Sequence, residues 1–201
     1  MQRRPASFDL QPDTVLDTLG AEGDCIARGA RPLPPAAVQA AFAAVGEPVL
    51  AQRELRLEEY FNGRLWADGV VLDRRGRERR RFHVDMQALW EGDWGRLQES
   101  YLFDDGERQH RTWNLRRLPP QQSLRRYEAS AADVVGRARG SGSGHVLRWN
   151  YCLALALRHG VLRVQVDDSM YLLGDKMLLG YTELRKFGVR VASLVLSYGK
   201  P

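Results

Sequence analysis

Two charged residues occupy positions that an alternating pattern predicts to be buried. In RLQESYLFDDG, Glu99 shares one face of a predicted strand with Tyr101, and in RQHRTWNLRRL, Arg111 shares a face with Trp113. The two runs flank one predicted turn, so Arg111 can neutralise Glu99 from the adjacent strand. We interpret the pair either as a structural ion pair or as a group that anchors a ligand or exchanges protons.

These side chains suit the binding of an apolar ligand that carries a carboxylate. Burial of its apolar part would hold such a ligand, and one charged hydrogen bond would fix its orientation. We therefore predict Arg111 as the carboxylate anchor of a fatty-acyl or similar molecule, with Glu99 beside it. The predicted walls of the pocket are four aromatic residues, Trp66, Tyr101, Trp113 and Trp149.

A catalytic role is an alternative. An enzyme that isomerises or cyclises a lipid-type intermediate inside the same pocket would need a general base, and Glu99 and Asp133 are the candidate carboxylates. Either would require a raised pKa. Asp167 and Asp168 are adjacent in VDDSMY and therefore point to opposite faces of a strand, so they do not form a dyad; we interpret them as turn or cation-pairing residues.

The sequence carries no motif for a metal or a cofactor. The histidines, at positions 83, 110, 145 and 159, lack the close spacing of metal ligands. The glycine-rich run GRARGSGSGH fits neither the dinucleotide pattern nor the Walker pattern, and a predicted strand follows it rather than a helix. The centre of GSGSG is Gly142 and not serine, so a nucleophile elbow is absent. We predict no metal and no cofactor.

A predicted antiparallel sheet positions these residues. From Leu55 onward the sequence alternates between apolar and polar, and a turn signal recurs about every ten residues. Such spacing leaves no room for crossover helices, which favours an all-β, up-and-down barrel of the lipocalin or calycin type with about nine strands. The candidate turns lie at 73–76, 91–95, 104–107, 118–122, 140–144, 158–160, 174–176 and 186–188.

The strand predicted from HVLRWNYCLALAL has two unlike faces. One face is large and apolar and includes Trp149, Leu153 and Leu155, whereas the other is small and mixed and includes Cys152 and Ala154. The small face leaves volume for a ligand or for a covering helix. Alternation alone does not decide between the ligand and the helix.

The first part of the chain differs from the rest. QPDTVLDTLG and PLPPAAVQAAFAAVGEP each combine a helix start, apolar residues at helical spacing and a glycine stop. We therefore predict a helical N-terminal extension over residues 1–50, with two short helices, and a barrel domain over 51–201. A further alternative for function is a non-catalytic module that docks a partner through this extension or through a basic turn.

That basic turn is the most concentrated charge of the sequence. The net charge is +5, and arginine supplies 27 of the 30 cations, spread through the chain. The segment from Arg74 to Arg81, here called the basic tip, gathers six of them around one predicted hairpin turn. It is either a solvated hairpin end or a surface attracted to an anionic membrane. No aromatic residues are interleaved with these arginines, so we predict no nucleic-acid partner.

The N-terminal residues give no sign of targeting. After MQRRP the sequence continues as ASFDLQPD rather than as an apolar run, and no segment approaches the roughly 20 apolar residues that a membrane-spanning helix needs. We therefore expect a cytoplasmic protein.

A set of short motifs recurs in one order along residues 50–200. The motifs are YFNG at 60–63, DR at 73–74, DG at 105–106, Arg111 with Trp113, DVVG at 133–136, DD and MY within 167–171, and KFG at 186–188. With these motifs the segment resembles a bacterial family catalogued as domain of unknown function 3833. The resemblance implies a lipocalin-type barrel and a role near modified membrane lipids, because genes of the family often lie beside genes for fatty-acyl modification. Members are often lipoproteins, whereas Cys25 here follows AEGD rather than an apolar segment with a lipobox.

Overall fold

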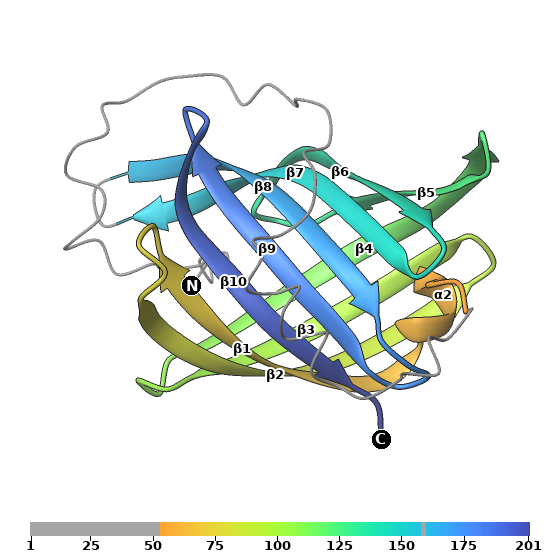
Figure 1. The fold of residues 1–201 in the computed structure, drawn as a ribbon, viewed down its shortest axis with the longest axis horizontal. Helices are drawn as coiled ribbons and strands as arrows, with labels where there is room; N and C mark the ends of the chain where they lie inside the picture. Colours follow the sequence, from red (N-terminus) through yellow and green to blue (C-terminus); the bar gives the residue numbers. More distant parts are fainter. Residues whose placement is uncertain (1–52, 158–159) are drawn as a thin grey trace, which may run out of the picture.

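Ten antiparallel strands form one closed barrel in the computed structural model, which describes residues 53–157 and 160–201 (Figure 1). The two helices predicted within residues 1–50 lie outside the described residues. The elements are α2 (Leu57–Tyr60), β1 (Gly63–Asp73), β2 (Glu78–Glu91), β3 (Trp94–Phe103), β4 (Arg108–Gln121), β5 (Leu124–Ser130), β6 (Val134–Ser143), β7 (Val146–Leu157), β8 (Gly160–Leu172), β9 (Leu178–Lys186) and β10 (Val189–Gly199).

The strand order confirms the predicted all-β, up-and-down topology. Each strand pairs with its neighbours in the sequence, and β1 pairs with β10 to close the barrel. The predicted number of about nine strands is too low by one. The additional connection joins β5 to β6 through Ala131, Ala132 and Asp133, which include no glycine or proline to signal a turn.

Alternation places the core inside the barrel. On β2, Phe82, Val84 and Met86 are buried, as their shared face predicts. On β7 the large apolar face is the inner one, since Trp149 and Leu155 are buried. The small face of β7 therefore does not supply the interior volume.

A short helix closes one end of the barrel, where the sequence predicts only extended structure. The backbone N–H of Leu55 donates to the carbonyl of Gly144 (2.8 Å), and the Trp90 indole N–H donates to the carbonyl of Phe61 (2.9 Å). These bonds tie the segment around α2 to the β6–β7 connection and to the end of β2 (Figure 1). We call this the α2 end. The opposite end, with the β1–β2, β3–β4, β5–β6 and β9–β10 connections, is the far end.

Aromatic rings lie over glycines of the neighbouring strand. A side chain on Gly69 would place its Cβ 2.4 Å from the ring of Phe82, its direct partner on β2, so the inner face of β1 has room for that ring only because residue 69 is glycine. The same arrangement recurs at Gly95 under Trp90, Gly140 under Trp149 and Gly199 under Trp66. Packing of this kind covers glycine backbone and fixes the register of adjacent strands.

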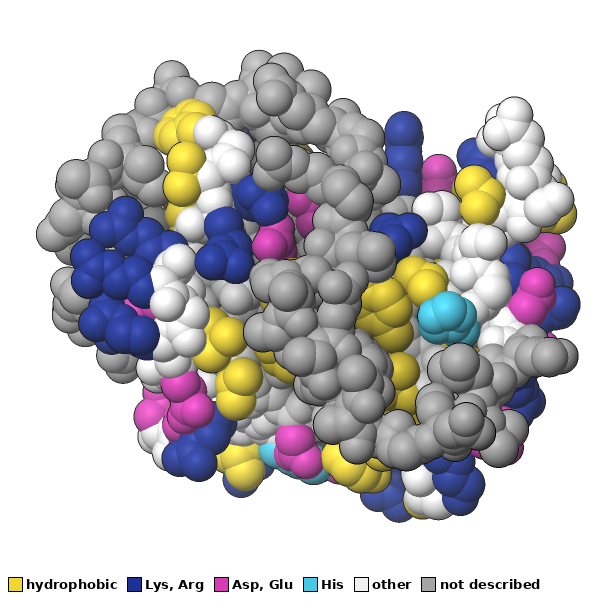
Figure 2. Space-filling view, in the orientation of Figure 1, with side chains coloured by type: hydrophobic (Ala, Val, Ile, Leu, Met, Phe, Trp, Pro, Cys, Tyr) yellow, Lys and Arg dark blue, Asp and Glu magenta, His cyan; other side chains and the backbone are white. Residues whose placement is uncertain are grey.

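The basic tip is partly neutralised by acidic residues at the far end. Arg77 and Arg79 each place Nε 3.1–3.2 Å from Asp73 Oδ2, and Arg80, which is buried, lies 2.7 Å from Asp105. Lys and Arg side chains gather with Asp and Glu side chains at the left of the molecule, away from α2 (Figure 2). Attraction of the basic tip to an anionic membrane stays a prediction. Within the described residues, no helix has the length and apolar character needed to cross a membrane.

Candidate functional site

The barrel interior contains a cavity of about 110 Å³ that is apolar over most of its wall. Residues from β2–β5, from β7–β10 and from the segment around α2 contribute to it. Its apolar lining consists of Leu57, Phe61, Phe82, Leu97, Trp113, Leu115, Ala129, Trp149, Leu153, Val166, Met170, Leu184, Leu194 and Leu196, and its polar lining of Glu99, Tyr101, Arg111, Tyr151, Asp168, Thr182 and Tyr198.

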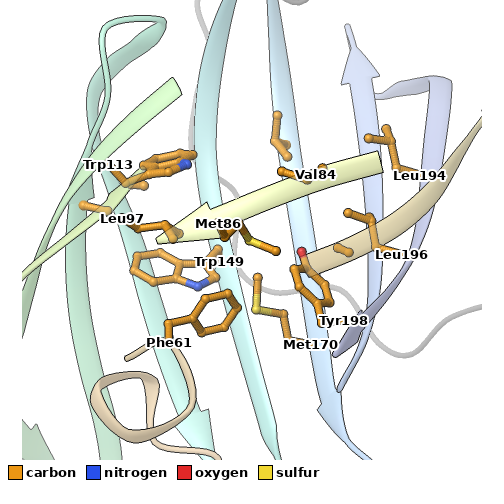
Figure 3. Packing of buried hydrophobic residues seen from close by; sticks show 14 of the residues in the cluster. Phe61, Val84, Met86, Leu97, Trp113, Trp149, Met170, Leu194, Leu196 and Tyr198 are labelled. Carbon is orange, nitrogen blue, oxygen red and sulfur yellow. The ribbon is translucent and has the colours of Figure 1, made fainter. Parts of the chain in front are cut away.

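The apolar floor of the cavity lies at the α2 end. Phe61, which follows α2, meets Tyr198 edge to face with ring centroids 5.7 Å apart. Phe61, Trp149, Met170 and Tyr198 point toward one another across the interior (Figure 3). These side chains separate the cavity from solvent at this end, so an apolar molecule bound against them would lose its contact with water.

Glu99 is a carboxylate inside the apolar wall. Its Oε2 atom accepts hydrogen bonds from the Tyr101 hydroxyl (2.8 Å) and from the Trp113 indole N–H (3.2 Å). Burial raises the pKa of Glu99, and the positive charge of Arg111 together with the two hydrogen bonds opposes only part of that rise. The carboxylate therefore holds a proton more readily than a solvated glutamate does.

Arg111 stands directly opposite Glu99 in the β3–β4 register, at the position that alternation predicts. Its Nη2 atom donates to Asp133 Oδ2, and both side chains are almost fully buried. Burial by itself lowers the pKa of Arg111, but the surrounding groups, which include Asp133 and Glu99, reverse the shift, so that the guanidinium remains charged. Asp133 lies in the β5–β6 connection, which puts this ion pair on the far-end side of the cavity.

Asp168 is a second interior carboxylate, on the opposite wall from Glu99. It is opposite Trp149 on β7 and Thr182 on β9, and the Thr182 hydroxyl donates to its Oδ1 atom (2.9 Å). Burial raises the pKa of Asp168 to about 7, and the negative charge of Glu99 adds to that rise. Asp167 lies on the other face, as its adjacency to Asp168 predicts, where it accepts a hydrogen bond from Asn150 and pairs with Arg185. The interpretation of Asp168 as a turn or cation-pairing residue is wrong, because it is buried within β8.

The structure brings five of the predicted site residues to the cavity wall: Glu99, Tyr101, Arg111, Trp113 and Trp149. The placement of Trp66 as a wall of the pocket is wrong. Its side chain lies on the outer face of β1, is 38% exposed, covers Gly199 and stacks on His83. Asp133 does not line the cavity either, because it faces Arg111 from the rim, and a direct role as general base is therefore not supported.

Several polar residues of the cavity were not predicted from the sequence. Asp168 shares its parity on β8 with buried Val164, Val166 and Met170, which is a signal that the sequence contains. Tyr151, Thr182 and Tyr198 likewise share their parity with buried apolar residues of β7, β9 and β10. Among residues 53–157 and 160–201, no group of three or more His, Cys, Asp or Glu could hold a metal ion.

Comparison with known proteins agrees with this architecture. Residues 40–200 match the family described as protein of unknown function (DUF3833). Among solved structures, the S-type phycobiliprotein lyase CPES from Guillardia theta is similar with a TM-score of 0.51 at 6% sequence identity, over 73% of this chain and 93% of that chain. At that identity the likeness shows a shared fold alone. No curated protein sequence matches the chain.

Proposed function

The chain belongs to the DUF3833 family of proteins of unknown function, and we propose that its barrel binds an apolar small molecule of the fatty-acyl kind. The observation that carries this proposal is the interior cavity, closed by Phe61 at the α2 end and lined mainly by apolar side chains. Small-molecule sites in proteins combine such a wall with a few convergent polar groups. Glu99, Arg111 and Asp168 are the convergent polar groups here.

The size of the cavity limits the ligand. At about 110 Å³ it is close to the apolar cavities of roughly 150 Å³ that bind benzene in engineered proteins. A ring or a short acyl segment therefore fits the described interior, whereas a complete long acyl chain needs additional space. Octyl compounds, whose chain is much shorter than a long acyl chain, serve as probes of this site. The connection to modified membrane lipids and a cytoplasmic location are parts of the same proposal.

We expect octanol to bind the delipidated protein and Ala129→Phe to weaken that binding at least about tenfold. Ala129 is the smallest side chain of the wall, and a phenyl ring there occupies space that the ligand needs. Isothermal calorimetry and native mass spectrometry measure the affinity. The matched control is Val161→Phe, at a position on β8 that is 65% exposed, which should leave binding unchanged. Absence of binding by the wild type, or equal binding by Ala129→Phe, would contradict the proposal.

Catalysis inside the same cavity is a second candidate, and the raised pKa values of Glu99 and Asp168 favour it. A buried carboxylate with a raised pKa is better suited to act as a general base than a solvated one. We expect Glu99→Gln to abolish turnover of a lipid extract while octanol binding survives. Product analysis by mass spectrometry before and after incubation measures the turnover. An unchanged extract with the wild type would remove this candidate and leave binding alone.

A further inference from the structure

We propose that the polar end of the bound molecule donates hydrogen bonds and carries no negative charge, as in an alcohol, an amide or an ammonium group. This inference rests on the proposed function and specifies the ligand class of the same cavity. The sequence predicted that a carboxylate of the ligand binds Arg111. We infer instead that an N–H or O–H group of the ligand donates a hydrogen bond to Glu99. Two observations support this inference. The cavity wall carries two carboxylates beside one guanidinium that is already paired, and it offers more hydrogen-bond acceptors than donors.

The charge of the interior does not favour an anion. Arg111 is the cation of the cavity wall, and its guanidinium is already bound to Asp133. Glu99 lies directly opposite Arg111, and Asp168 faces the cavity from the opposite side of the barrel. A ligand carboxylate would have to compete with Asp133 for Arg111 while lying next to Glu99. Like charges that lie close together on a mostly apolar wall repel each other.

The hydrogen bonds of the interior leave acceptors in excess. The Tyr101 hydroxyl and the Trp113 indole N–H both donate to Glu99 Oε2, and within the described part of the chain no hydrogen bond reaches Glu99 Oε1. Asp133 Oδ1 is likewise buried without a partner. Since Glu99 Oε1 can still accept a hydrogen bond on the cavity wall, a ligand that brings N–H or O–H groups gains more here than one that brings acceptors.

The position of Glu99 makes it the group that a donor would reach. It lies on the cavity wall, whereas Asp133 is at the rim behind Arg111. The apolar side chains at the α2 end would hold the tail of the ligand, and the head would then lie among Glu99, Arg111 and Asp168. The negative charge of Glu99 contributes to the raised pKa of Asp168 on the opposite wall.

The test compares octanol, octylamine and octanoate, which share one tail, by calorimetry on the full chain at neutral pH. We expect octanol and octylamine to bind at least about tenfold more tightly than octanoate. In Glu99→Gln, octylamine should lose at least about tenfold in affinity, while octanol changes by less than about threefold.

Two outcomes contradict the inference in different ways. Octanoate binding as tightly as octylamine, or more tightly, overturns the ligand class and leaves the proposed apolar cavity site intact. Failure of all three compounds to bind overturns the proposed function and this inference with it. The order of affinities in the wild type decides the question even where Glu99→Gln folds poorly.

Discussion

Arg111→Met is expected to lower the free energy of unfolding by about 3–5 kcal/mol, because removal of one partner from a buried ion pair leaves the other charge without compensation. The exposed fractions of the Arg111 and Asp133 side chains are 11% and 7%, so water cannot replace the guanidinium. Glu99, opposite Arg111, would lose the same positive charge. Methionine retains much of the arginine's volume, so that the change measured is mainly that of charge.

Urea denaturation followed by tryptophan fluorescence measures this effect. Adding Asp133→Asn to Arg111→Met removes the uncompensated charge and should restore part of the stability. The matched surface control is Arg137→Met, because Arg137 pairs with Glu128 at an exposed fraction of 64% and such pairs contribute about 1 kcal/mol or less. A loss in Arg111→Met no larger than that of Arg137→Met would show that the interior pair is solvated.

The architecture could be predicted from the sequence because its two determinants are local. Alternation set the inner and outer faces of β2, β3 and β4, and the glycine-containing turns set where the chain reverses. The β5–β6 connection was missed since Ala131 and Ala132 do not signal a turn. Closure by α2 was missed for another reason: four residues, LEEY, are too few to show a helical period, and their position depends on distant contacts such as that of Glu58 with Tyr127.

The site could be predicted only in part, because parity identifies a face without saying whether that face is inside. Glu99 and Arg111 were found since apolar neighbours on the same parity marked their face as buried. The prediction for Trp66 failed because its neighbours Leu65 and Ala67 hold the inner face of β1, where the space at Gly69 is filled by Phe82 from β2. The face of a strand that carries its largest side chain is therefore not always the inner face, because a large side chain of the neighbouring strand can fill the interior instead.

The partner of Arg111 could not be predicted from strand patterns at all. Asp133 belongs to a connection, and connections have no parity. Its contact with Arg111 depends on how β5 ends beside β4, where Asn114 pairs with Ser130. The sequence thus predicts Arg111 and the neighbouring carboxylate of Glu99 correctly, but it does not predict that Asp133 binds the guanidinium. Because Asp133 already binds the guanidinium, less positive charge is left for a ligand anion, and the inferred ligand class depends on this.

Asp168→Asn is expected to make the protein more stable than the wild type by on the order of 3 kcal/mol at about pH 8, with the difference vanishing near pH 4. The pKa of Asp168 is about 7 in the folded protein, whereas an aspartate of the unfolded chain titrates at about 3.9. Between these values the folded state binds the proton and the unfolded state does not, so wild-type stability falls as the pH rises and levels off above the folded pKa. Asparagine retains an acceptor for the Thr182 hydroxyl and carries no charge to bury.

Urea denaturation over this pH range measures the difference. The control is Asp167→Asn on the outer face, whose stability should fall with rising pH as that of the wild type does. Parallel stability curves for Asp168→Asn and the wild type would contradict this prediction, because they would show that Asp168 is fully ionised at neutral pH in the folded protein.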